Sequence, residues 1–94
     1  DNTATVTQTS TAGQANSSII LQTRSADFTN STVNQTGEGN RSDITQGGDR
    51  AAVTVTQNGT DNTSDVDQDA NRASTTVTQT GNDNFSDVDQ TADA

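Results

Sequence analysis

The chain has 94 residues, a formal net charge of −9 and 24% hydrophobic residues, with two Phe as its only aromatic side chains. This length allows one small domain, and the composition alone is typical of a disordered chain, because it offers too little apolar area for a conventional core. Four basic residues leave no patch for nucleic acid or an anionic membrane, and the absence of Cys and His removes thiol chemistry and the commonest catalytic base and metal ligand.

Glutamine recurs at fixed intervals along the chain. Gln35, Gln57 and Gln79 are 22 residues apart, and a second set with the same spacing is offset from them by 11 residues. The second set is Gln46, Gln68 and Gln90, and Gln8 and Gln22 extend the two sets toward the N-terminus. Disordered polar sequence has no reason to keep such spacing, so the repeat predicts a solenoid built from stacked units.

Residues of alternating character precede each glutamine, and a period of two is the signal of a β-strand. In chain order, the residues expected to face inward are Ala4, Val6, Gln8; Asn16, Ser18, Ile20, Gln22; Ser31, Val33, Gln35; Asn40, Ser42, Ile44, Gln46; Val53, Val55, Gln57; Asn62, Ser64, Val66, Gln68; Thr75, Val77, Gln79; and Asn84, Ser86, Val88, Gln90. Two of these strands joined by an arc make one rung. Four rungs are predicted, over residues 2–24, 29–48, 51–70 and 73–94.

Tight arcs are expected after the first glutamine of each regular rung. Gly37, Gly59 and Gly81 each follow that glutamine by two residues, and glycine accepts the positive φ that a tight arc needs. The first rung is longer by three residues between Gln8 and Asn16 and by two after Gln22. We interpret these as loop insertions, with Gly13 in place of the early glycine.

The predicted fold is all-β: a β-solenoid with two parallel, in-register sheets about 10 Å apart and rungs about 4.8 Å apart. Val6, Val33, Val55 and Val77 would stack on one sheet, and Ile20, Ile44, Val66 and Val88 on the other. An unpaired buried amide costs about 1–3 kcal/mol, but in an in-register stack each Gln or Asn can donate to one neighbour and accept from the other. The end rungs have no Pro and no helix to protect their edges, so a cross-β fibril is expected.

The pattern Gln-x-Gly-x-x-Asn-x-Ser-x-Val-x-Gln, found at residues 57–68 and 79–90, resembles the curlin repeat. The resemblance extends over nearly the whole chain. It implies a secreted subunit of curli, the extracellular amyloid fibres of bacterial biofilm matrix, which serve adhesion and surface colonisation. It also implies identical subunits as the main partner, with a minor curlin nucleator and an outer-membrane secretion pore. Ala51 and Ala73 replace the small Ser of the commonest pattern, so major subunit and nucleator both stay open.

Localisation and activity follow the same expectation. The chain begins at Asp1, as a secreted product does after loss of its signal peptide, although a trimmed chain would look the same. No apolar run approaches the roughly 18 residues of a membrane-spanning helix, so membrane insertion is not expected. A solid stack of two sheets offers no cleft, so we expect no enzyme activity and no cofactor.

Outward-facing residues suggest further hypotheses. Stacked carboxylates at Asp43, Asp65, Asp67, Asp87 and Asp89 should have raised pKa values, which suggests a pH gate on assembly; a plain solvated face is the alternative. Asp65, Asp67, Asp87 and Asp89 are also weak candidates for Ca²⁺. Arg50 and Arg72 could pair with Asp49, Asp69 or one of the acidic columns, or could simply moderate the acidic repulsion between rungs.

Two other outward features have competing interpretations. Threonines at 5, 7, 32, 54, 56, 76 and 78, interrupted by Asn34, resemble an ice-binding array, which is the alternative function; the β-propensity of Thr also explains them. Ile19 and Leu21 replace polar residues and suggest either a docking patch or a differently packed first rung under a long loop.

Overall fold

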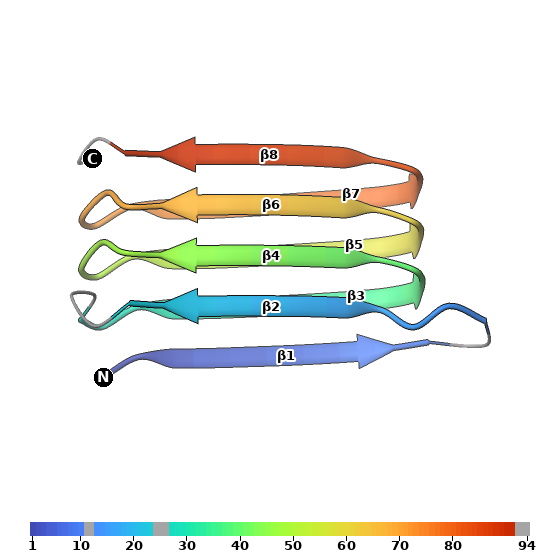
Figure 1. The fold of residues 1–94 in the computed structure, drawn as a ribbon, viewed down its shortest axis with the longest axis horizontal. Helices are drawn as coiled ribbons and strands as arrows, with labels where there is room; N and C mark the ends of the chain where they lie inside the picture. The colour runs from blue at the N-terminus through green and yellow to red at the C-terminus, as the bar shows by residue number, and fades with distance from the viewer. Residues whose placement is uncertain (11–12, 24–26, 92–94) are drawn as a thin grey trace.

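A computed structural model of the chain describes residues 1–10, 13–23 and 27–91 (Figure 1). The regular structure of these residues consists of strands alone. The eight strands are β1 (Thr3–Thr9), β2 (Ser17–Gln22), β3 (Asn30–Glu38), β4 (Arg41–Gln46), β5 (Ala52–Thr60), β6 (Thr63–Gln68), β7 (Ser74–Asn82) and β8 (Phe85–Gln90). The ends of the predicted first and last rungs, at residues 24 and 92–94, lie outside the described residues.

The odd-numbered and even-numbered strands form separate parallel sheets, in the orders β1-β3-β5-β7 and β2-β4-β6-β8. Figure 1 shows the result as four stacked rungs, with β1 and β8 at opposite ends of the stack. Pairing is in register along the whole stack: Val33 pairs with Val55 and Val55 with Val77, while Ile44 pairs with Val66. The predicted fold class, an all-β solenoid with two parallel in-register sheets, is confirmed.

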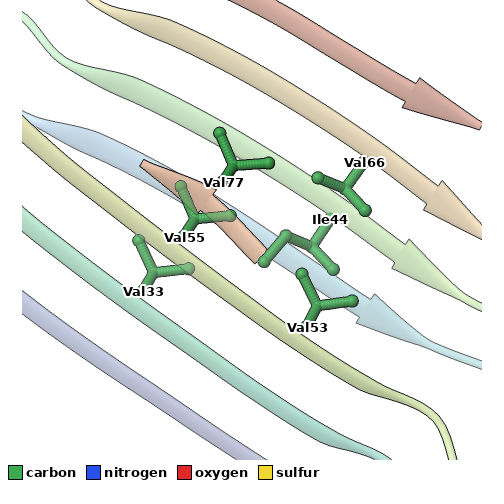
Figure 2. Packing of buried hydrophobic residues seen from close by; sticks show 6 residues of the cluster. All are labelled: Val33, Ile44, Val53, Val55, Val66 and Val77. Carbon is green, nitrogen blue, oxygen red and sulfur yellow. The ribbon is translucent and has the colours of Figure 1, made fainter. Parts of the chain in front are cut away.

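A narrow apolar core lies between the sheets. Its members are Val33, Ile44, Val53, Val55, Val66 and Val77, all buried, and Figure 2 shows the valines of the first sheet facing the aliphatic side chains of the second. Each buried aliphatic side chain contributes about 1.5–3 kcal/mol. Ile20 and Val88 pack against this cluster but are only partly buried, because each lies in an end rung with a neighbour on one side only.

The arc between the two strands of a rung contains two residues with positive φ. Gly37 and Gly59 have φ of 108° and 138°, and the following corner residues Gly39, Asp61 and Asp83 have φ of 63°, 55° and 56°. In the first rung, Gly39 N–H donates to Gln14 O as Asp61 N–H donates to Glu38 O. This equivalence aligns Gly13, at φ 103°, with Gly37, so the regular arc is recovered at Gly13.

The arc that leads from one rung to the next also turns through a left-handed residue. Phe28, Arg50 and Arg72 have φ of 60°, 56° and 58°. Sequence reasoning missed these corners, because Phe and Arg give no signal of positive φ, which costs a non-glycine residue about 1 kcal/mol or more. The conformation is held by the stack: Arg50 N–H donates to Asp27 O at 2.7 Å and Arg72 N–H to Asp49 O at 2.8 Å.

Gly59→Ala should destabilise the fold by more than about 2 kcal/mol, because an added Cβ would overlap the carbonyl oxygen of Gly81 on the next rung. Gly81→Ala is the matched control. Its φ of +106° is also unfavourable for alanine, but the nearest atom to its Cβ, Asn84 Nδ2, is 3.6 Å away. Midpoints of denaturant unfolding should therefore fall much further for Gly59→Ala, and equal midpoints would contradict the close approach of successive arcs.

Candidate functional site: the amide ladders and the open ends

Glutamine side chains of the first sheet form a continuous hydrogen-bonded ladder. Gln8 Nε2 donates to Gln35 Oε1, Gln35 to Gln57 and Gln57 to Gln79, each at 2.7 Å. A second N–H of Gln35, Gln57 and Gln79 crosses to the other sheet, as where Gln57 Nε2 donates to Arg41 O at 2.9 Å. Gln35 and Gln57 are 1% exposed, so their amides are buried and fully used as donors.

The second sheet has its own glutamine ladder, which runs in the same direction. Gln22 Nε2 donates to Gln46 Oε1 at 3.2 Å, Gln46 to Gln68 at 3.3 Å and Gln68 to Gln90 at 2.9 Å. Hydroxyls of the first sheet join it: Ser31 Oγ donates to Gln46 Oε1, and Thr75 Oγ1 donates to Gln90 Oε1 at 2.6 Å. In both ladders every glutamine–glutamine bond of the described residues therefore runs from Nε2 toward the C-terminal end of the stack.

Asparagines form a third ladder that runs in the opposite direction. Asn40 Nδ2 donates to Asn16 Oδ1 at 3.2 Å, and Asn62 to Asn40 and Asn84 to Asn62 at 3.0 Å. The backbone N–H of the donating residue reaches the same oxygen, as in Asn62 N to Asn40 Oδ1 at 3.1 Å. Asn62 Nδ2 also donates to Gly81 O at 2.8 Å, so this ladder fixes the arcs as well as the strands.

Two inward-facing serines take no part in the hydrogen-bonded ladders. Ser42 and Ser64 are fully buried, and their hydroxyls have no hydrogen-bond partner among the described residues. Each hydroxyl therefore adds a desolvation cost that no bond offsets. The repeat predicted that these serines face inward, but sequence spacing gives no sign that their hydroxyls are unsatisfied.

Several groups that interior rungs bury are more exposed in the end rungs, although Val77 and Gln79 on β7 are only 6% exposed. Val6 is 46% exposed, Gln8 is exposed, and Asn84, Val88 and Gln90 are half-buried. At the C-terminal end of the stack, defined by β7 and β8, an open groove of about 480 Å³ is lined by Val77, Gln79, Asn84 and Val88 among others. The structure thus places every predicted ladder residue in register, and the ladders stop at two open ends.

The outward acidic residues stack as the repeat predicted, with Asp65 next to Asp87 and Asp67 next to Asp89. Partial burial, together with the charges of Asp69, Asp89 and Asp65, raises the pKa of Asp67 above its usual value. Within the described residues no group of three or more acidic side chains converges as metal ligands, and the Ca²⁺ hypothesis stays a prediction.

Charge pairing and the first rung differ from what sequence suggested. The ion pair in the described part of the chain joins Arg41 and Asp43, whereas Arg50 and Arg72 form none there, so the expected pairing with Asp49 or Asp69 is wrong.

β2 pairs in register with β4, and Ile19 and Leu21 remain 58% and 55% exposed. The interpretation of a differently packed rung beneath a loop is therefore wrong.

Parallel in-register strands, internal amide ladders and bare strand edges define a repeat protein of the cross-β solenoid class. Comparison with known families finds the curlin associated repeat at residues 48–81 and again at residues 59–91. Residues 48–91 therefore carry curlin associated repeats, as the resemblance indicated for them. No curated protein and no solved structure matches the chain. Among the described residues, no helix is long and apolar enough to cross a membrane.

Gln57→Leu should destabilise the fold by about 2–4 kcal/mol, because it removes a donor and an acceptor and leaves buried partners on Gln35, Gln79 and Arg41 unsatisfied. Ser64→Ala is the matched control, since it removes a buried polar atom that has no partner. We expect it to leave stability unchanged or to raise it by up to about 1 kcal/mol. Denaturant unfolding tests both variants. An equal loss of unfolding free energy in the two would contradict a stabilising role for the glutamine ladder.

Lowering the pH from about 7 to about 4 should stabilise the folded chain. A carboxyl whose pKa is higher in the folded chain binds more protons there, so folding is favoured as the pH falls toward that pKa and loses stability as the pH rises through it. Asp67→Asn should reduce this gain relative to the unsubstituted chain, because the raised pKa belongs to that carboxyl. The measurement is the unfolding midpoint of both chains at both pH values, and an unchanged pH dependence in Asp67→Asn would contradict the assignment.

Proposed function

We propose that this protein is a structural subunit of an extracellular, curli-type amyloid fibre. The observation that carries the proposal is that each end of the stack presents the groups that every interior rung uses to bind its neighbour. Both sheets end in unpaired strand edges at β1 and β2 and at β7 and β8. Such edges are templates for another chain, and the described part of this chain covers neither with a helix, a bulge or Pro.

The role that follows is assembly of identical subunits outside the cell, for biofilm matrix, adhesion and surface colonisation. The curlin repeat supports the assembly, and the finer roles come from the family resemblance. Nucleation by a minor curlin and export through an outer-membrane pore belong to the same proposal. The space between the sheets is filled by valine, isoleucine and amide side chains, which suits a structural and non-enzymatic protein.

Electron microscopy and fibre diffraction of the purified chain test this function. Long unbranched fibrils with a meridional spacing near 4.8 Å are the expected result, since that spacing is the separation of successive rungs. Diffraction must come from fibrils grown without added seeds. A chain that stays monomeric for days at high concentration would overturn the proposal.

A second candidate is ice binding, which one feature of the first sheet favours. Thr5, Thr32, Thr54 and Thr76 occupy one column in register on the outward face. In the neighbouring column, Asn34 stands between Thr7 and Thr56, so that column is interrupted. Thermal hysteresis of the soluble chain discriminates: a freezing-point depression with shaped ice crystals supports ice binding, and its absence leaves the threonines as strand-forming residues.

A further inference from the structure

Most of the large hydrophobic side chains exposed in the described residues lie on the end strands of the two sheets, and Phe28 lies in the arc between β2 and β3. On the outer face of the second sheet they are Ile19 and Leu21 on β2, 58% and 55% exposed, and Phe85 on β8, 72% exposed. The two interior strands of that face, β4 and β6, carry arginine, threonine and aspartate at the same positions. A patch for an unrelated partner would have no reason to be divided between the first and last strands.

Strand register shows how the two halves can meet. The column that ends at Phe85 begins at Ser17, the column of Asp87 begins at Ile19, and the column of Asp89 begins at Leu21. A second copy that continues the sheet places its β2 directly beyond β8 of the first. Phe85 then lies beside Ser17 of that copy and diagonal to its Ile19, within reach of an aromatic ring.

The amide ladders select this orientation of the second copy. At the C-terminal end, Gln79 Nε2 donates to Thr63 O and keeps one N–H for a further rung, while nothing described donates to Asn84 Oδ1. At the N-terminal end, Gln8 Nε2 is used on Gln35, which leaves Gln8 Oε1 as the outward acceptor. Donor meets acceptor only when a C-terminal end meets an N-terminal end. With like columns opposed, two C-terminal ends would bring glutamine donor to glutamine donor and asparagine acceptor to asparagine acceptor.

Charge favours the same contact. Inside the chain, Asp65 stacks on Asp87 and Asp67 on Asp89, and like charges directly opposite on neighbouring strands are destabilising. At the junction each acidic column meets Ile19 or Leu21 instead of another carboxylate. The junction between two molecules therefore lacks the carboxylate–carboxylate repulsion that is present between β6 and β8 within one chain.

We propose that Ile19 and Leu21 of one copy and Phe85 of the preceding copy form an apolar seam on the outer face of each junction. The seam binds a second copy of this chain and makes the fibre polar, with the C-terminal end of each subunit on the N-terminal end of the next. This inference rests on the proposed function and adds the residues and the direction of the contact.

Cysteine cross-linking tests the direction and register of the junction on which the seam depends, because the chain has no Cys of its own. The positions changed by Ser17→Cys and Phe85→Cys are about three rungs apart in one chain, roughly 14 Å, and cannot bridge within a molecule, whereas between copies they lie about 4.8 Å apart. Oxidised fibres of the double variant should give a ladder of covalent oligomers. Each single variant is a control and should stay monomeric; a covalent dimer of the Phe85→Cys variant would show opposed C-terminal ends and overturn the proposal.

A composition-matched variant distinguishes the seam from non-specific hydrophobic association. Thr63→Phe with Phe85→Thr moves the ring one rung inward in the same column and leaves composition unchanged. We expect the critical concentration for fibre growth to rise about two- to fivefold, the effect of losing one good cross-strand pair. An unchanged critical concentration would overturn the seam.

The two proposals fail in distinguishable ways. If the double cysteine variant forms fibres that yield no disulfide between positions 17 and 85 of neighbouring copies, the seam is overturned and the proposed function stands. If the unsubstituted chain forms no fibres, the proposed function is overturned and the seam with it.

Discussion

The hydrogen bond between a buried side-chain amide and its copy one rung away is the constraint on which the rest of this structure depends. Gln35, Gln57 and Gln79 bury polar groups that would each cost about 1–3 kcal/mol if unpaired. They are paired only when identical residues lie in register, as the 2.7 Å contacts show. A slip of one residue would bring these amides to the outer face and break every ladder together. The polar core thus fixes register more strictly than an apolar core of the same size.

That constraint explains which parts of the structure the sequence predicts. Rung number, strand positions, sheet type and inward residues all follow from glutamine and asparagine spacing, because a ladder tolerates insertions only in arcs. The insertion before Asn16 illustrates this: Gly13 and Gln14 recover the equivalent arc positions before the strand resumes. The same logic predicted the acidic columns on the outer face, since outward positions inherit the register.

Other features have no signature in residue type. The left-handed corners at Arg50 and Arg72 arise because the stack holds their backbone, and arginine itself gives no hint of that conformation. Amide direction is equally hidden, since Gln and Asn can each donate either way along a ladder. The finding that glutamines donate toward the C-terminal end and asparagines toward the N-terminal end needs coordinates. It also gives the two ends of one chain different chemistry.

Interior rungs and end rungs carry the same ladder residues in different surroundings, because an end rung has a neighbour on one side only, and this connects the fold to assembly. Gln57 is buried and saturated, whereas Gln8, in the same column, is exposed. Addition of another copy at each end would bury the exposed ladder residues of the end rung, through the same kinds of hydrogen bond that already join the rungs of one chain. Fibre growth would therefore use the same contacts as folding. The terminal strands of the second sheet differ from its interior strands mainly in the apolar residues of their outer face.

Solid-state NMR of fibres labelled in glutamine side chains, with ¹⁵N at Nε2 and ¹³C at Cδ, tests the central claim most directly. Magnetisation should pass from each Nε2 to the Cδ of a different glutamine, because the donor contacts the neighbouring amide oxygen at 2.7 Å in the first-sheet ladder. The account predicts such inter-residue cross-peaks at Gln35, Gln57 and Gln79. Fibres that show only the one-bond transfer within each side chain would contradict it.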